Sequence, residues 1–332
     1  MDRSEVLASI KRAAQDGVTE LNLASQAIEY LPPEIGELSD LVHLDLDGNF
    51  FPNVPVEIGG LSRLKVLRLG GNHELKVIPQ EVFNLPHLTE LILPGFETAV
   101  PPQIGDLRSL EILGFVSGPL KALPEEIGKC TGLTELYVNF TFLEELPAGI
   151  GNLIKLKKLH LWNIASEPSN LLPPQISQLS NLRELFICGH EMKSLPPEIG
   201  DLCNLTELTM IGTHLDELIP EMGRLEKLEK LHIVGNNFSV IPEEIGKLTN
   251  LKKLRVVNTP VKELPHVLGE LINLEELDIH SLQLEIVPPE IINLPRLKKL
   301  TINKRDYPKL RSSMDGLPDS VKLDLMPSRW DT

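Results

Sequence analysis

The chain has 332 residues, of which 42% are hydrophobic, 4% aromatic and 24% charged, and its formal net charge is −15. The apolar fraction excludes a disordered chain, and the negative charge argues against nucleic acid as a partner because phosphates are repelled. Leucine supplies 61 residues, whereas Trp, Tyr and Phe together supply 14. Such an excess indicates a short unit copied many times rather than two cores of mixed composition.

The first predicted element is a helix within residues 4–15. Its apolar side chains recur at helical spacing, and Gly17 follows as a stop signal. We interpret residues 1–17 as an N-terminal helical cap with an apolar face of Val6, Leu7, Ile10, Ala13 and Ala14. The segment is charged where a signal peptide needs an apolar stretch, and no run of about 18 apolar residues follows. We therefore expect neither secretion by that route nor membrane insertion.

A repeat of about 23 residues is predicted to fill residues 18–319. The copy at residues 228–250 reads LEKLHIVGNNFSVIPEEIGKLTN. Its first part alternates apolar and polar side chains, as a strand with one buried face does. Its second part places Pro and Glu at the start of a short helical or 3₁₀ segment. A single unit cannot bury its leucines, so we expect the copies to stack with about thirteen parallel strands on one side. The copies begin at residues 18, 41, 64, 88, 110, 133, 156, 182, 205, 228, 251, 274 and 297.

The pattern LxxLxLxxNxLxxLPxEIGxLxx resembles the leucine-rich repeat family at nearly every position. Its LPxEIGxLxxL variant is similar to the intracellular Ras-group type, and the opening DGVTELNLAS is similar to bacterial leucine-rich repeat proteins, including the repeat segments that precede Roco GTPase modules. The resemblance implies an α/β fold, a curved right-handed solenoid with a parallel concave sheet and short helical or 3₁₀ convex segments. It also implies a scaffold that binds a protein or peptide on the concave sheet.

The C-terminal end departs from the repeat. The copy that begins at Leu297 loses its EIG segment, and a last strand is predicted at Val321–Leu325. We interpret residues 320–332 as a capping strand and tail, with Trp330 folding back over the end. Alternatively, the chain is cut from a longer protein.

The ninth repeat position normally holds Asn, whose amide satisfies buried backbone groups. Here only Asn49, Asn72 and Asn236 occupy it. Polar residues that could substitute in part are Gln26, Thr141, His190, Thr213 and Thr259, whereas Phe96, Ile164 and Leu282 cannot form hydrogen bonds there. Altered loops or bound waters are expected in those repeats.

The fifth and seventh positions of each copy are expected to point from the strand into the concavity, and they are polar at the ends of the chain and apolar in the middle. We predict one contiguous patch of Tyr137, Trp162, Phe186, Cys188 and Ile211, with Phe140 and Phe142 at its margin. Apolar patches rich in aromatic residues mark interaction sites, although scattered surface hydrophobes are the alternative. The copy that begins at residue 156 also carries three extra residues right after Trp162, and insertions often lie on the binding face. The full predicted protein-binding set is Ile92, Val116, Tyr137, Phe140, Phe142, His160, Trp162, Phe186, Cys188, Ile211, His232 and Val234.

Charged residues outside this set are predicted to be structural. The glutamate that recurs in the helical turn, such as Glu244, favours a helix start and keeps the convex side soluble. The pairs Lys252–Lys253, Glu275–Glu276 and Lys298–Lys299 alternate in sign on neighbouring strands, which predicts a solvated charge ladder.

Enzymatic chemistry finds no support in the motifs. The chain has no phosphate-binding glycine loop, and His160 and His232 lie about 14 Å apart on the predicted strands, too far to share a metal. Cys130, Cys188 and Cys203 cannot close a disulfide framework, which fits a reducing compartment. We therefore predict a cytoplasmic, monomeric, non-catalytic scaffold without cofactor or metal. The alternatives are the recognition module of a larger enzyme system (a bacterial effector, or a regulatory segment of a GTPase or ubiquitin ligase) and a lectin for sugars or small ligands.

Overall fold

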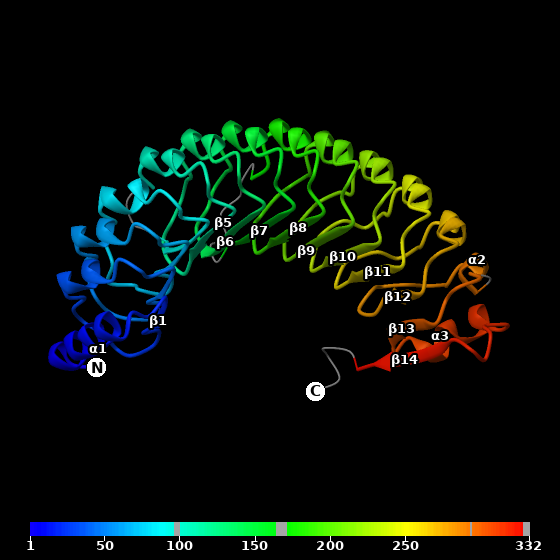
Figure 1. The fold of residues 1–332 in the computed structure, drawn as a ribbon. Coiled ribbons are helices and arrows are strands. Elements are labelled where there is room, and N and C mark those ends of the chain that lie inside the picture. The colour runs from blue at the N-terminus through cyan, green and yellow to red at the C-terminus, as the bar shows by residue number, and fades with distance from the viewer. Residues whose placement is uncertain (96–99, 164–170, 293, 328–332) are drawn as a thin grey trace. The chain divides into compact units, whose positions relative to one another are not determined.

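The computed structural model describes residues 1–95, 100–163, 171–292 and 294–327. The chain divides into two units, Met1–Ala165 and Ser166–Thr332, which are described separately below. Within each unit, parallel strands line the inner side and short 3₁₀ segments line the outer side (Figure 1). The predicted leucine-rich repeat solenoid is therefore confirmed.

The helix expected near the start of the chain is α1 (Arg3–Asp16), and it begins with a capping box. The Asp2 carboxylate accepts hydrogen bonds from the backbone N–H groups of Ser4 and Glu5 at 2.8 and 2.9 Å, and the Glu5 side chain accepts one from the Asp2 N–H at 2.7 Å. Gly17 ends the helix in the left-handed conformation, at φ 60°. The helix contacts the first 3₁₀ segment through a buried face of Val6, Ile10 and Ala13, whereas Leu7 is half-buried and Ala14, expected on that face, is exposed.

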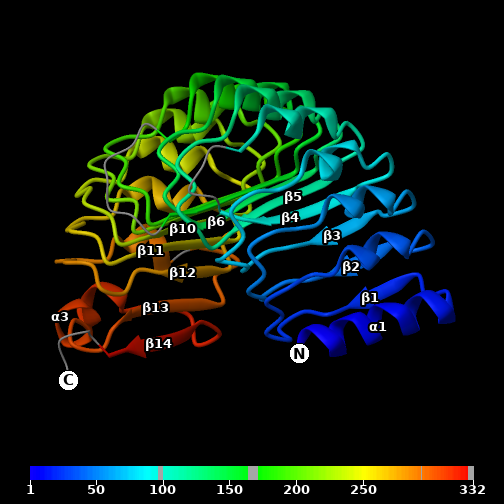
Figure 2. The same ribbon diagram turned by 90° about the vertical axis from the view of Figure 1, so that its left-hand side faces the viewer.

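The strands within each unit pair in parallel, and each pair joins neighbours in chain order (Figure 2). The register places equivalent positions of successive copies side by side, for example Leu231 beside Leu254. The predicted last strand exists, one residue later than expected. The first unit contains β1 (Glu20–Asn22), β2 (His43–Asp45), β3 (Val66–Arg68), β4 (Glu90–Pro94), β5 (Ile112–Val116), β6 (Glu135–Thr141) and β7 (Lys158–Asn163). The second contains β8 (Glu184–Cys188), β9 (Glu207–Ile211), β10 (Lys230–Val234), β11 (Lys253–Val257), β12 (Glu276–Asp278), β13 (Lys299–Asn303) and β14 (Lys322–Met326).

In the first eleven copies the EIG half or its equivalent forms a five-residue 3₁₀ segment, and in ten of these a proline in extended conformation comes directly before it. Where this segment carries glycine the next copy can pack close against it: a Cβ on Gly36 would lie 2.3 Å from the carbonyl oxygen of Glu57. The first unit contains η1 (Pro33–Glu37), η2 (Val56–Gly60), η3 (Gln80–Asn84), η4 (Pro102–Asp106), η5 (Glu125–Lys129) and η6 (Ala148–Asn152). The second contains η7 (Pro174–Gln178), η8 (Pro197–Asp201), η9 (Pro220–Arg224), η10 (Glu243–Lys247), η11 (His266–Glu270), α2 (Pro289–Ile292), α3 (Tyr307–Leu310) and η12 (Arg311–Met314).

The core consists of the repeated leucines and the isoleucine of EIG. Leu208, Leu231 and Ile199 are fully buried between the strand and the 3₁₀ segment of their copies. This burial confirms the inward assignment that the alternating pattern predicts. Burying a leucine or isoleucine side chain stabilises the fold by about 1.5–3 kcal/mol, and the pattern repeats along both units.

Asparagine at the ninth position does what the family pattern implies. The Asn49 side-chain amide donates to the carbonyl oxygens of Leu23 and Leu46, both at 2.9 Å. Its carbonyl oxygen accepts from the backbone N–H groups of Gln26 and Ile28 at 3.1 and 3.0 Å. Asn49 therefore satisfies four backbone groups of two successive copies.

The expected substitutes behave differently from one another. The Thr213 hydroxyl donates to Asn236 at 2.7 Å, so it joins the asparagine network. The hydroxyl oxygens of Thr141 and Thr259 are buried and have no hydrogen-bond partner among the described residues, so for these two the expected substitution is wrong. Gln26 is exposed and its amide donates to Ala24, two residues away in the chain.

Two further ninth positions are buried. Leu282 is buried, and its apolar side chain offers the backbone no hydrogen bond there. His190 is also buried, and burial lowers its pKa to about 4, which keeps the imidazole neutral near pH 7. Phe96, Ile164 and Trp330, also considered from the sequence, lie outside the described residues.

Helices long and apolar enough to cross a membrane do not occur in the described ranges. The three cysteines are free thiols: Cys130 is buried, Cys188 half-buried and Cys203 exposed.

Candidate functional site

In the first unit, the fifth and seventh positions of successive strands form two rows across one face of the sheet. On β6, Leu136 and Val138 point into the core, whereas Tyr137 and Asn139 point to the opposite face because side chains alternate along a strand. The register continues the fifth-position row from Gly114 through Tyr137 to His160, and the seventh-position row from Val116 through Asn139 to Trp162.

Four side chains of β6 and β7 form an aromatic cluster, which we define as Tyr137, Phe140, His160 and Trp162. The rings of Tyr137 and His160 meet edge to face, with centroids 5.0 Å apart. The rings of Phe140 and Trp162 stack with centroids 4.3 Å apart and planes tilted by 35°. Phe140 is 38% exposed and Trp162 37% exposed. The cluster therefore presents a large apolar surface to solvent.

A β-bulge brings Phe140 into the cluster. Asn139 lies beside Trp162 and Thr141 beside Asn163, so Phe140 is the extra residue between two ladder positions. Its φ of +58° is in the left-handed region, which costs a residue with a Cβ about 1–2 kcal/mol. The sequence placed Phe140 at the margin of the patch together with Phe142; in the structure Phe140 contacts Trp162 directly, whereas Phe142 is half-buried.

The bulge also corrects the assignment of the ninth position in the copy that begins at residue 156. Counting along the chain assigns that position to Ile164, but Asn163 lies beside Thr141 in the register. The Asn163 amide donates to the carbonyl oxygen of Leu143 at 3.3 Å, so Asn163 is the residue that pairs with the ninth position of the preceding copy. Counting residues could not detect this because the shift arises in the preceding copy.

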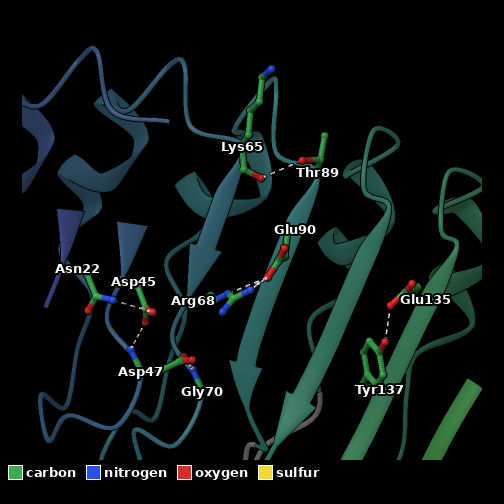
Figure 3. Close-up of polar contacts among 10 residues, drawn as sticks. All are labelled: Asn22, Asp45, Asp47, Lys65, Arg68, Gly70, Thr89, Glu90, Glu135 and Tyr137. Carbon is green, nitrogen blue, oxygen red and sulfur yellow. Dashed lines mark hydrogen bonds and ion pairs between the residues drawn. The ribbon is translucent and has the colours of Figure 1, made fainter. Parts of the chain in front are cut away.

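Tyr137 is held by a polar network on the same face. Its hydroxyl donates to the Glu135 carboxylate (Figure 3). The same carboxylate also pairs with the Lys158 ammonium at 3.1 Å. Burial alone would raise the pKa of Glu135, but the hydrogen bonds from Tyr137 and Lys158 outweigh it and lower the pKa. The ionised carboxylate therefore fixes the orientation of the Tyr137 ring.

An apolar floor, defined as Ile92, Pro94 and Val116, lies on β4 and β5 beside the cluster. Ile92 spreads over the space that side chains at Gly70 and Gly114 would fill: a Cβ on Gly114 would lie 2.7 Å from Ile92 Cδ1, and one on Gly70 would lie 3.1 Å from Ile92 Cγ2. Ile92 and Val116, both predicted site residues, are half-buried, and Pro94 is buried. The floor therefore carries no charged side chain, and the two glycines beside Ile92 add no side chain to it.

An acidic pair, Asp45 and Asp47, lies beyond the floor and was not among the predicted site residues. Asp45 accepts from the Asp47 N–H at 3.1 Å and from the Asn22 amide at 3.5 Å, and Asp47 accepts from the Gly70 N–H at 2.6 Å (Figure 3). Burial, and then the charge of Asp45, raise the pKa of Asp47 to about 6. The signal was visible in the sequence, because both aspartates occupy the fifth and seventh positions.

Arg68 lies next to the acidic pair in the fifth-position row. Its guanidinium binds Glu90, with Nε and Nη2 both 2.7 Å from the same carboxylate oxygen (Figure 3). Among the described residues, no ion pair joins Asp45 or Asp47 to a cationic side chain. This part of the face therefore keeps a surplus of negative charge.

The predicted site residues of the second unit line the equivalent positions of β8, β9 and β10. The register places Phe186 and His232 on either side of Thr209, and Cys188 and Val234 on either side of Ile211. Phe186, Cys188, Ile211, His232 and Val234 are half-buried, and Thr209 is buried. Burial raises the pKa of Cys188 and lowers that of His232.

The prediction that these residues form one contiguous patch with Tyr137 and Trp162 stays a prediction. The insertion after Trp162 falls on residues 164–170, outside the described part of the chain.

Ion pairs cover the strand face of the second unit from β10 to β14. Distances between the charged atoms of five of these pairs lie between 2.7 and 3.2 Å: Lys252–Glu229, Lys253–Glu276, Arg255–Asp278, Lys298–Glu275 and Lys299–Asp324. Most of these side chains are substantially exposed, so each pair contributes at most about 1 kcal/mol. The predicted charge ladder is confirmed.

Clusters of three or more His, Cys, Asp or Glu side chains that could hold a metal ion are absent from residues 1–95, 100–163, 171–292 and 294–327. The strand face of the first unit instead carries apolar, aromatic and anionic side chains, which are suited to recognition of another molecule.

Comparisons with known proteins agree with this architecture. The profile of the family described as "Leucine-rich repeat region" matches residues 79–194 and 174–259, together more than half of the chain. No significant match was found among curated proteins.

Several solved structures share the fold. A leucine-rich repeat protein of Leptospira interrogans is 25% identical with a TM-score of 0.66, over 95% of this chain and 98% of that one. An internalin of Listeria monocytogenes, InlF, is 19% identical with a TM-score of 0.75, over 98% and 94%. The leucine-rich repeat ectodomain of the plant receptor kinase GASSHO1/SCHENGEN3 from Arabidopsis thaliana, solved in complex with CASPARIAN STRIP INTEGRITY FACTOR 2, is 22% identical with a TM-score of 0.65, over 89% and 37%.

Proposed function

This chain belongs to the leucine-rich repeat family, and we propose that it is a non-catalytic module that binds a protein or peptide on the strand face of its repeats. The observation that carries the proposal is the stacked and exposed pair of Phe140 and Trp162. Tryptophan and tyrosine are enriched among the residues that dominate binding energy, and this pair has a tyrosine beside it.

The residue type at position 140 supports the proposal. A left-handed backbone recurs at this position of the repeat, for example at Gly71, Ser117 and Gly235, so the turn of the repeat accounts for the φ of Phe140. Those copies place glycine or a small polar residue there, whereas this copy carries a phenylalanine whose stacked ring remains 38% exposed. The turn does not need a large apolar ring at this exposed position, whereas contact with a partner would use one.

The structural neighbours give a second line of support. The GASSHO1/SCHENGEN3 ectodomain was solved with a bound factor, and we extend binding of a protein or peptide from that architecture to this chain. Three free thiols favour a reducing compartment, so we also propose a cytoplasmic location. We further propose that the chain acts as a monomer.

The test is a selection from a displayed library of random dodecapeptides on the full chain, followed by calorimetry of the selected peptides. Trp162→Ala should weaken binding by about thirtyfold or more, because truncating a central aromatic anchor removes about 2 kcal/mol. Glu244→Ala, on the side opposite the strands, should leave the affinity unchanged. Circular dichroism checks that both variants fold. The proposal fails if no peptide is enriched, or if the enriched peptides bind Trp162→Ala as tightly as the unchanged chain.

A further inference from the structure

The first unit carries two chemically different ends on one strand face. The acidic pair, Asp45 and Asp47, lies at the end of β2, and the aromatic cluster lies on β6 and β7. The strands between them follow in chain order without interruption (Figure 2). The surface between the two ends is the apolar floor, with Arg68 at its acidic side.

The distance between the ends follows from the register. The fifth-position row steps from Asp45 to Arg68, Ile92, Gly114, Tyr137 and His160, one strand at a time. Strands lie about 4.8 Å apart, so the four or five steps span about 19–24 Å. An extended peptide rises about 3.3 Å per residue and covers this span in about six or seven residues.

The acidic end has no ion pair of its own among the described residues. Arg68 lies close enough to favour both negative charges, but its guanidinium is bound to Glu90 at 2.7 Å, so the two aspartates share this one cation with a third carboxylate. Burial, and then the charge of Asp45, outweigh Arg68 and keep the pKa of Asp47 raised. A cationic side chain brought to this place would add a counter-charge and lower that pKa.

The floor permits an extended chain to pass. Gly70 and Gly114 contribute no side chain to the rows, and Ile92 covers the space of both glycines. A ligand backbone crossing the strands here would contact Ile92 and Val116, which are half-buried and apolar.

Resting on the proposed function, we infer that this face binds an extended peptide that runs across the strands, with a lysine or arginine at Asp45 and Asp47 and an aromatic or large aliphatic side chain on the aromatic cluster, about six or seven residues apart. Charge complementarity selects the basic residue, and the exposed rings of Phe140 and Trp162 select the apolar one.

The experiment begins from the peptides selected on the full chain as described above. Their sequences should show a lysine or arginine at the stated spacing from a Trp, Phe, Tyr or Leu. Replacing that basic residue by Glu should weaken binding by about tenfold or more, since a like charge then faces the acidic pair. The affinity of the original peptides should also fall with added salt.

The matching change in the protein is the double variant Asp45→Asn, Asp47→Asn, which keeps side-chain size and one acceptor oxygen at each position, enough for the backbone N–H groups of Asp47 and Gly70. It should weaken the same peptides by about tenfold and remove most of the salt dependence. Asp278→Asn is the control, because this aspartate also occupies a fifth position but is already paired with Arg255 at 3.2 Å. It should change neither quantity.

The outcomes separate the two proposals. If binding depends on Trp162 but the peptides carry no basic preference, or if the double variant binds like the unchanged chain, this inference is wrong and the binding function stands. If Trp162→Ala leaves binding intact, or if nothing is enriched, both are wrong.

Discussion

The side chain of Asn49 predicts a large and local effect on stability. It forms four hydrogen bonds with backbone groups, those of Leu23, Leu46, Gln26 and Ile28, at distances between 2.9 and 3.1 Å. The Leu46 carbonyl also accepts from the Asn72 amide at 3.0 Å, so three groups lose their partner when Asn49 is replaced by Ala. Each such bond contributes about 1 kcal/mol net, so Asn49→Ala should lower the free energy of unfolding by about 3 kcal/mol.

The matched control is Thr259→Val at the same repeat position. The Thr259 hydroxyl oxygen is buried without a hydrogen-bond partner among the described residues, so removing it should leave stability unchanged or raise it by about 1 kcal/mol. Urea unfolding followed by circular dichroism gives both values, and amide hydrogen exchange of peptides covering residues 20–30 shows whether the Asn49→Ala loss is local. A loss below about 1 kcal/mol for Asn49→Ala, or an equal loss for both variants, would refute the conclusion that the Asn49 side chain stabilises the fold through its backbone hydrogen bonds.

Three further predictions concern the core, the thiols and pH. Leu231→Ala should lower stability by about 3 kcal/mol in urea unfolding through lost burial and a residual cavity, whereas Lys253→Ala on the exposed charge ladder should change it by at most about 0.5 kcal/mol; equal losses would contradict the inward and outward assignments. Burial raises the pKa of the Cys130 thiol to about 12, so a disulfide reagent at neutral pH should modify the exposed Cys203 rapidly and Cys130 only on unfolding. The folded pKa of His190 is about 4, below its ordinary 6.5, so the unfolded chain binds a proton at a higher pH than the folded chain. The free energy of unfolding should therefore fall as the pH decreases from 6.5 toward 4, by up to about 3 kcal/mol. His190→Gln should flatten that part of the stability–pH curve, and an unchanged slope would show that His190 is not its source.

The fold could be predicted from the sequence because its determinants are local and repeated. The alternating leucines fix which side of each strand is buried, and the proline before EIG fixes where the 3₁₀ segment begins. Both signals recur so often that a single irregular copy does not obscure them.

The site was predicted less well because it depends on how one copy pairs with the next. The sequence around Phe140 does not reveal which residue is left without a partner on the neighbouring strand. The structure shows that it is Phe140, because Asn139 pairs with Trp162 and Thr141 pairs with Asn163. In the same way, Ile92 is prominent because its neighbours in the rows, Gly70 and Gly114, have no side chain.

Exposure also depended on neighbours. Thr209 and Val257 occupy positions that face away from the core, yet both are buried by adjacent side chains. The acidic pair could have been proposed from its row positions, but the structure was needed to show that neighbouring Arg68 forms its ion pair with Glu90 rather than with either aspartate.

The pairing of each strand with its predecessor has a consequence for synthesis. Ladder partners within a unit are about 23 residues apart in sequence, as Leu231 and Leu254 are, so a newly made copy finds its docking surface already present. Helix α1, with its own capping box, precedes the first copy and offers it a starting surface. Each unit can therefore fold vectorially while translation proceeds, one copy at a time, without waiting for distant parts of the chain.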